Sequence, residues 1–99
     1  MLNFFRTSVL IAALTALSDE IWGYAEIAFK EVRSAKAQAA FLRNEGFNVE
    51  LGVAGMPSGL VATYGEGKPV IGFLGEFDAL IGMSQKVSTV RDPVTEGAP

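Results

Sequence analysis

The chain is 99 residues long, carries a net charge of −3 and contains neither histidine nor cysteine. These absences exclude, within these residues, Ser-His-Asp triads, cysteine nucleophiles, disulfides and zinc sites of the Cys/His type. No cluster of Lys and Arg forms a stripe, so no nucleic-acid partner is expected, and a hydrophobic fraction of 49% suits one small packed domain.

The N-terminal segment, residues 1–17, allows two interpretations. Arg6 precedes an apolar run from Ser8 to Leu17, and Ala16-Leu17-Ser18 resembles the cleavage site of an export leader. Against a leader, apolar residues recur at helical spacing straight through that point: Leu10, Leu14, Leu17, Ile21, Tyr24 and Ala28. This continuity favours one helix over about residues 7–28, with a break near Ser18 left open, and a cytoplasmic protein. The apolar run is too short to span a bilayer, so no membrane partner is expected.

A second helix is predicted from Ser34 to the residues before Gly46. Ser34 suits the N-cap, where its hydroxyl accepts an otherwise unpaired backbone N–H. Three apolar residues fall on one face of this helix: Ala35, Ala39 and Leu42. Gly46 suits the position just after the helix because glycine adopts the left-handed conformation at little cost, and Phe47 is then expected to contact Leu42.

Three strands are predicted to follow. Residues 47–51 alternate between apolar and polar, as in a half-buried strand. Residues 54–59 have loop composition, residues 60–64 form a second short strand, and the glycine-rich turn at 65–69 lacks the spacing of a phosphate-binding loop. Residues 70–77 are almost continuously apolar, which predicts a strand buried on both faces. Two helices followed by three strands predict an α/β fold.

Glu76 and Asp78 are the candidate site residues. They lie two apart at the end of the predicted buried strand, so their side chains are expected on one face. Ligands of open α/β sheets bind beyond the carboxyl ends of strands. Two carboxylates there can bind a hard cation, orient a metal-bound histidine or act as acid and base, but they can equally solvate the strand end.

A second cluster lies upstream, around the predicted end of the first helix. Trp22 and Tyr24 are expected to pack in the core or at its edge, and Glu26 is expected to cap a helix or pair locally rather than to act in catalysis.

Several separate motifs resemble those of one enzyme family, in the same order. They lie at residues 18–26, 45–50, 53–59, 75–80, 82–86 and 96–99. The family is the metal-dependent amidohydrolases of the aminoacylase and carboxypeptidase G type, and the match is nearest to its aminobenzoyl-glutamate utilisation branch of the B-subunit type. Several motifs in order are more specific than any one of them.

The resemblance implies a zinc or manganese hydrolase that cleaves amide bonds, such as the bond to glutamate in aminobenzoyl-glutamate. Residues 18–99 then correspond to an N-terminal portion of the catalytic domain, with residues 1–17 as a preceding helix or leader. In that family a metal-binding Gly-His-Gly-Cys-Gly-His stretch follows a Gly-Ala-Pro like residues 97–99, and these 99 residues do not contain it. We therefore expect this chain alone to bind no metal and no other cofactor, and to be inactive.

The resemblance also bears on the two carboxylates. Asp78 matches a family aspartate near the metal centre, and Glu76 matches the residue two before it, which is a metal-binding histidine in related branches. Only an outer-shell role is therefore implied for Asp78 and Glu76, with no metal ligand in this chain. Ile81 stands where the family usually has proline, so the resemblance does not determine the exact turn after Asp78.

Two other functions stay open from the residues alone. One is a non-catalytic binding or regulatory module derived from the same domain, and the other is a small exported protein with the Ser8–Leu17 run as its leader. For the enzyme, the expected partner is a small-molecule amide substrate, and the full-length family implies a homo-oligomer.

Overall fold

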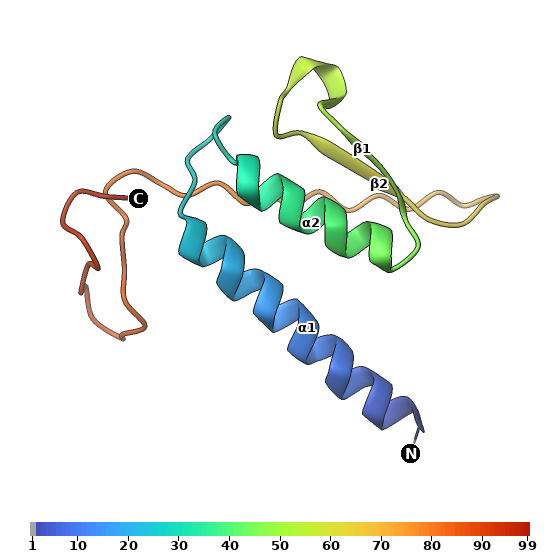
Figure 1. Cartoon of the computed structure of the whole chain (residues 1–99), viewed down its shortest axis with the longest axis horizontal. Coiled ribbons are helices and arrows are strands. Elements are labelled where there is room, and N and C mark those ends of the chain that lie inside the picture. Colours follow the sequence, from blue (N-terminus) through green and yellow to red (C-terminus); the bar gives the residue numbers. More distant parts are fainter. Residues whose placement is uncertain (1) are drawn as a thin grey trace.

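The computed structural model describes residues 2–99, with side chains from residue 4 onward. The described chain forms helix α1 (Leu2–Tyr24), helix α2 (Val32–Asn44), strand β1 (Asn48–Leu51), a single 3-10 turn η1 (Val53–Gly55) and strand β2 (Leu60–Thr63). Figure 1 shows α1 beside α2, the hairpin of β1 and β2 on the other side of α2, and the remaining chain as an extended segment and loops. The α/β class is as predicted.

Helix α1 differs from its predicted bounds at both ends. It begins by Leu2, runs through Ser18 without a break and ends at Tyr24, because Ala25 leaves the helix with a left-handed backbone (φ 48°). Its apolar residues lie all round the helix rather than along one face. None of the helices in the described part of the chain is long and apolar enough to cross a membrane.

The predicted start of α2 is wrong. The helix begins at Val32, with Glu31 at the N-cap position and no cap bond from the Glu31 side chain. Ser34 therefore lies inside the first turn, where its side chain is buried. Helix α2 buries Ala35 and Ala39, which are two of the three apolar residues predicted to share a face.

The predicted end of α2 is confirmed. Gly46 has a φ of 90° and donates its N–H to the Arg43 carbonyl at 3.0 Å, while Phe47 donates its N–H to the Leu42 carbonyl at 3.0 Å. These two bonds make a Schellman motif, which satisfies carbonyls that the helix leaves unpaired. The Phe47 ring then packs against the Tyr64 ring, with centroids 5.1 Å apart, and this contact joins α2 to the chain beyond β2.

Strands β1 and β2 form an antiparallel hairpin, and both were predicted. Val49 pairs with Ala62 in the ladder and is buried. The connection between the strands folds back on itself, because Gly52 donates its N–H to the Gly59 carbonyl at 2.8 Å. Together with α2 the hairpin makes the small core of the described chain.

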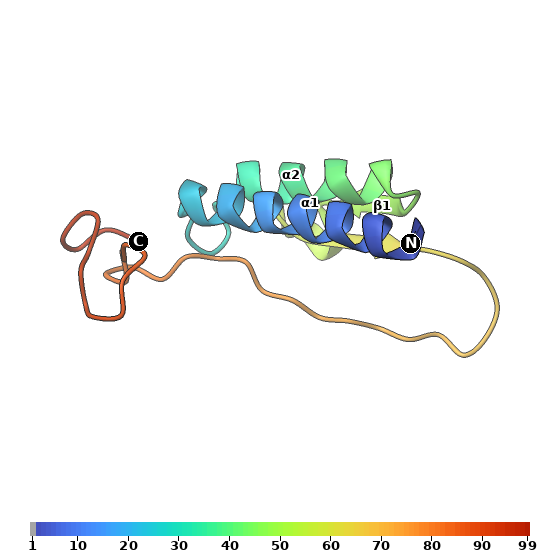
Figure 2. The same cartoon turned by 90° about the horizontal axis from the view of Figure 1, so that it is seen from below.

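The predicted third strand, residues 70–77, is not formed in the described chain. This segment is extended but pairs with no strand among residues 2–99, and Phe73 and Leu74 are 96% and 97% exposed. Figure 2 shows it passing beneath the helices, outside the hairpin sheet. A strand is stabilised by its ladder bonds and by cover on its faces, and no described element supplies either here.

Candidate functional site

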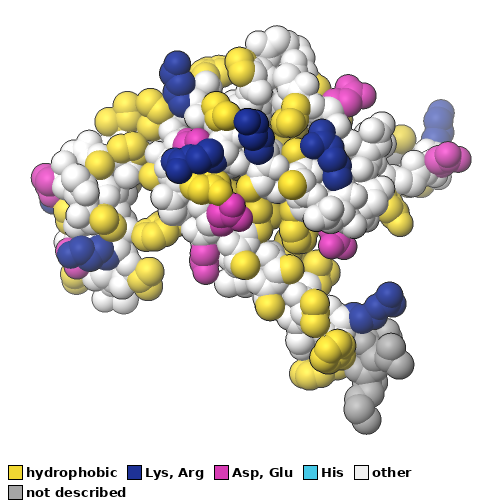
Figure 3. Space-filling view, viewed as in Figure 1, with side chains coloured by type: hydrophobic (Ala, Val, Ile, Leu, Met, Phe, Trp, Pro, Cys, Tyr) yellow, Lys and Arg dark blue, Asp and Glu magenta, His cyan; other side chains and the backbone are white. Residues whose placement is uncertain are grey.

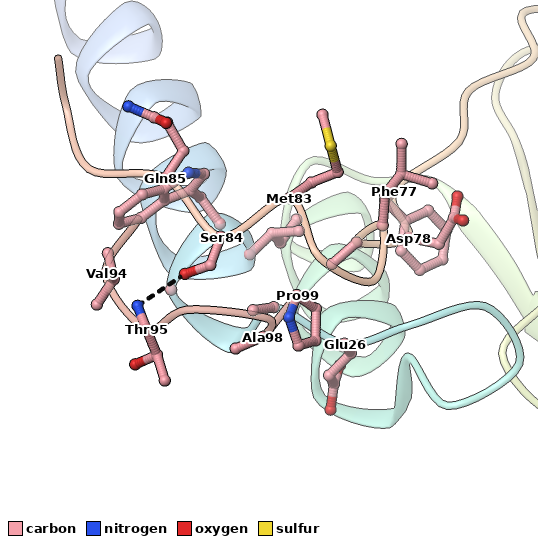
Figure 4. Close-up of a pocket in the computed structure, with 16 residues that line it drawn as sticks. Glu26, Phe77, Asp78, Met83, Ser84, Gln85, Val94, Thr95, Ala98 and Pro99 are labelled. Atoms are coloured by element: carbon pink, nitrogen blue, oxygen red, sulfur yellow. Dashed lines mark hydrogen bonds between the residues drawn. The ribbon is translucent and has the colours of Figure 1, made fainter. Parts of the chain in front are cut away.

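The segment after residue 77 returns to the body of the molecule and borders an open-sided cavity of about 400 Å³ at the end of α1, which we call the α1-end cavity. Its walls are the last turns of α1, residues 25–26, and two stretches of the C-terminal loops (Figure 4). The lining is mainly apolar, and the polar residues that contribute to it are Glu26, Asp78, Ser84, Gln85 and Thr95. A cavity of this size and mixture suits a small molecule.

Asp78 and Glu76 lie in different places. Asp78 is half-buried and lines the α1-end cavity, whereas Glu76 is exposed and lines a second, more open hollow beside Leu14, Leu17 and Trp22. The structure does not bring the two carboxylates together, because the segment that carries them is not held in a sheet. Their roles stay predictions.

These two carboxylates do not fit a metal site by themselves. Within residues 2–99, no three Asp, Glu, His or Cys side chains gather closely enough to hold a metal ion. A zinc site, or a site for a hard cation such as magnesium, needs several ligands around one point. Asp78 and Glu76 offer only two ligands, and these lie in separate hollows.

Trp22 lies at the edge of this site rather than in the core. Its side chain is 58% exposed and it lines both the α1-end cavity and the second hollow. Tyr24, two residues further along, is half-buried, and the Arg33 guanidinium lies 4.4 Å from its ring centroid. The Tyr24 hydroxyl donates to Glu20, and this bond raises the pKa of Tyr24.

Glu26 caps α2 from outside the helix. One carboxylate oxygen, Oε1, accepts the Arg33 backbone N–H at 3.0 Å and the Arg33 Nε–H at 3.2 Å. The other, Oε2, accepts the Ser34 backbone N–H at 2.8 Å and the Ser34 hydroxyl at 2.9 Å. The prediction that Glu26 caps or pairs locally is confirmed, and the residue predicted as the cap, Ser34, is one of its partners.

The Glu26 carboxylate is ionised under ordinary conditions. Burial opposes its charge, but the hydrogen bonds from the Ser34 and Arg33 backbones, followed by those of their side chains, outweigh burial and lower the pKa of Glu26 to about 2. The carboxylate also sits at the positive end of the α2 dipole. A group with this pKa is a fixed anion rather than a proton donor at neutral pH.

The backbone of Glu26 reaches the candidate site as well. Its carbonyl accepts the Ala79 N–H at 2.8 Å, next to an isolated parallel bridge between Ile27 and Ala79. Ala79, the residue after Asp78, is therefore hydrogen-bonded to the Glu26 backbone. The Glu26 side chain in turn binds the first turn of α2. Figure 4 shows the Glu26 side chain extending away from Asp78, toward α2.

A second buried acid fastens the β1–β2 connection to α2. The Ser58 hydroxyl donates to Glu31 Oε2 at 2.6 Å, and both residues are 8% exposed. Burial opposes the charge of Glu31, but the Ser58 hydrogen bond and nearby backbone N–H groups outweigh it and lower its pKa. No sequence signal pointed to this pair, because the two residues are 27 apart.

The C-terminal loops close the remaining wall of the cavity. Ser84 donates its N–H to the Ala98 carbonyl at 3.0 Å, and its hydroxyl oxygen accepts the Thr95 N–H at 3.2 Å, which is the dashed bond in Figure 4. An ion pair between Lys86 and Asp92, at 2.8 Å, lies further along the same loop. The loop is therefore ordered by its own polar contacts.

Comparison with known proteins gives a clear sequence relationship. The chain is 44% identical over 77 residues to the B-type subunit of p-aminobenzoyl-glutamate hydrolase from Escherichia coli (strain K12), and the aligned part covers 78% of this chain and 16% of that protein. No protein-family model matches the chain, and no solved structure matches it. The chain is thus related to that hydrolase protein through most of its own residues, while it spans only 16% of the relative's length.

Proposed function

We propose that this chain is part of a metal-dependent hydrolase that cleaves an amide bond, such as the one in aminobenzoyl-glutamate. The observation that carries the proposal is the 44% identity over 77 residues to a protein named as part of a p-aminobenzoyl-glutamate hydrolase. The motif order at residues 18–26, 53–59 and 75–80 supports the same enzyme class.

In this proposal, residues 18–99 form an N-terminal portion of the catalytic domain. Asp78 lines the α1-end cavity, and its neighbour Ala79 is fixed by the Glu26 carbonyl. We assign Asp78 and Glu76 outer-shell roles only, in which they orient groups that contact the metal or the substrate. Glu26 is assigned a positioning role, because its side chain holds the start of α2 and its backbone carbonyl holds the segment that carries Asp78.

The only support for a metal in this proposal is the family resemblance, which implies zinc or manganese. Asp78 and Glu76 do not fit a complete metal site, so we propose that the ligands come from polypeptide carrying the Gly-His-Gly-Cys-Gly-His stretch. The 99-residue chain alone is then expected to bind neither zinc nor manganese stoichiometrically and to leave aminobenzoyl-glutamate intact. Calorimetric titration with each metal measures metal binding. Chromatography of aminobenzoyl-glutamate after incubation with the chain measures whether the substrate is cleaved.

We also propose a cytoplasmic location. Helix α1 continues through Ser18 without a break, which supports a structural helix over a leader that ends there. Fractionation of cells that express the tagged chain tests this directly.

The decisive experiment transplants the chain into its relative. The segment of the Escherichia coli protein that matches these 77 residues is replaced by the residues of this chain, and release of p-aminobenzoate from p-aminobenzoyl-glutamate is measured in the assembled hydrolase. We expect the chimera to cleave the substrate. A chimera that folds, by circular dichroism, but releases no product contradicts the proposal.

Matched variants of the chimera test the role of the candidate site. Asp78→Asn is expected to lower activity by about 10- to 100-fold, as is usual when an outer-shell partner is lost. Glu66→Gln removes an exposed carboxylate that does not line the α1-end cavity, and it is expected to leave activity unchanged. Equal activity of the two variants contradicts the role given to Asp78.

A further inference from the structure

The apolar part of the α1-end cavity includes large side chains that are open to solvent. Trp22, in the last turn of α1, is 58% exposed, and Leu80 and Met83 are 61% and 66% exposed. An indole presents a broad flat face, and contact between two aromatic rings adds to the attraction that apolar burial supplies. The lining therefore suits a flat aromatic group that lies against Trp22.

The charges of the lining are all negative. Glu26 and Asp78 contribute carboxylates, and no Lys or Arg lines the cavity in the part of the chain that the structure describes. Glu26 is paired with Arg33, whereas Asp78 takes part in no ion pair among residues 2–99. A bound carboxylate would meet like charge here with no cation to pair with, which is unfavourable.

The basic side chains that adjoin the cavity are engaged in ion pairs. Lys86 follows Gln85 in the chain, but its Nζ lies 2.8 Å from a carboxylate oxygen of Asp92. Arg33 Nε lies 3.2 Å from Glu26 Oε1. On the face seen in Figure 3, the basic side chains gather mainly over α2 and the connection before it. The cavity therefore favours uncharged groups over anionic ones.

Most polar side chains of the lining bind the protein itself. Gln85 donates from Nε2 to two carbonyls of its own loop at 3.0 and 2.9 Å, and its Oε1 accepts the Asp92 N–H at 3.1 Å. The Ser84 hydroxyl oxygen accepts the Thr95 N–H at 3.2 Å. Selection in this cavity therefore depends on apolar contact and charge more than on hydrogen bonds to the ligand.

We propose that the α1-end cavity holds the aromatic half of an aryl amide substrate, and that Trp22 determines this specificity by contact with the ring. The inference rests on the proposed function, which supplies the substrate class. p-Aminobenzoyl-glutamate has an uncharged aromatic half and a glutamate half with two carboxylates. The charge of the lining assigns the aromatic half to this cavity and leaves the glutamate half outside it.

The first test measures binding of each half of the substrate to the full 99-residue chain. The probes are 4-aminobenzamide for the aromatic half and N-acetylglutamate for the other half. Trp22 is the only tryptophan of the chain, so its indole N–H gives a single cross-peak in a proton–nitrogen correlation spectrum. We expect 4-aminobenzamide to shift this cross-peak saturably, with a Kd of about 1 mM for so small a ligand, and N-acetylglutamate to leave it in place. No shift with 4-aminobenzamide, or the same response to both probes, overturns the proposal.

Nuclear Overhauser contacts then locate the ring, because Trp22 also lines the second hollow. A ring in the α1-end cavity lies near the methyl groups of Met83 and Val94, whereas a ring in the second hollow lies near those of Leu14 and Leu17. We expect contacts to the first pair. Contacts to the second pair alone overturn the proposal.

Variants of the full chain test the role of the indole. Trp22→Leu keeps an apolar side chain but removes the ring, and it is expected to weaken binding of 4-aminobenzamide by about 3- to 10-fold, while Trp22→Phe retains most of the affinity. Phe73→Ala, which removes a ring that is 96% exposed and does not line the cavity, is expected to bind as the wild type does. Saturation-transfer NMR measures the affinities, and circular dichroism compares the folds. Wild-type affinity in a helical Trp22→Leu variant overturns the proposal.

The same substitutions in the chimera separate this inference from the proposed function. We expect Trp22→Leu to raise the KM for p-aminobenzoyl-glutamate by about 3- to 10-fold with little change in kcat, because the ring contact is the same in the ground state and the transition state, and we expect Trp22→Phe to restore the KM. An active chimera whose KM is unchanged by Trp22→Leu overturns the inference and leaves the proposed function standing. A folded chimera without activity contradicts the proposed function, and the binding experiments on the full chain then decide whether the cavity takes the aromatic ring.

Discussion

Glu26 Oε2 accepts two hydrogen bonds from one residue, the backbone N–H and the hydroxyl of Ser34, at 2.8 and 2.9 Å. This pairing caps α2 with a carboxylate that comes from the connection before the helix rather than from the N-cap residue, Glu31. It also explains why Ser34 is buried although it lies in the first turn of a helix.

Glu26→Gln tests this cap. The amide has one accepting oxygen in place of two, and its NH₂ group faces backbone N–H donors, so at least one bond to Arg33 or Ser34 is lost. We expect a lower midpoint of thermal unfolding and less helix by circular dichroism. Glu66→Gln, which changes an exposed carboxylate in the turn after β2, serves as the control and is expected to leave the midpoint unchanged. Equal midpoints in the two variants would count against the cap.

The same carboxylate predicts how stability depends on pH. The pKa of Glu26 is about 2 in the folded chain against an ordinary value of 4.5, so the folded state binds its proton less readily than the unfolded state. Its contribution is therefore complete above about pH 4.5 and is lost as the pH falls toward 2. Urea unfolding of the wild type and Glu26→Gln is expected to differ at neutral pH, with the difference shrinking through this window. A difference that is constant with pH contradicts the assignment.

Ser58→Ala tests the tie between the β1–β2 connection and α2. It removes the hydroxyl that donates to buried Glu31 and leaves the carboxylate with fewer partners, which is expected to cost about 1–2 kcal/mol of unfolding free energy. Ser18→Ala, at an exposed position in α1, is the control and is expected to change stability by less than about 0.5 kcal/mol. In a double-mutant cycle with Glu31→Gln, additive effects would show that the two side chains do not interact.

Local signals were sufficient for part of this fold. The end of α2 at Gly46 follows from one residue that tolerates a positive φ, and β1 and β2 follow from short apolar patterns next to a turn. The start of α2 could not be predicted in the same way, because its cap comes from Glu26, seven residues before Arg33. Ser34 has the right chemistry for an N-cap and uses it as a donor to Glu26 instead.

Features that depend on distant residues could not be predicted from the sequence. The apolar character of residues 70–77 predicts a buried strand, but a strand also needs neighbours, and none pairs with this segment in residues 2–99. For the candidate site, the sequence pointed to Asp78, which lines the α1-end cavity. It did not indicate that Glu76 lies in another hollow, or that Glu31 and Ser58 meet across 27 residues.

Gly46→Ala tests the one turn in which glycine is required by the capping geometry. An added Cβ would lie 3.6 Å from the Tyr64 ring, an ordinary contact, so the cost comes from the positive φ of 90°. We expect a loss of about 1–2 kcal/mol in unfolding free energy. Gly72→Ala is the matched control, because no atom lies within 4 Å of its added Cβ and its φ is not in the positive range; it is expected to be neutral or to stabilise by about 0.4–1 kcal/mol through the unfolded chain. Chemical unfolding of both variants measures the contrast, and a Gly46→Ala variant as stable as Gly72→Ala would show that the Schellman motif does not determine where α2 ends.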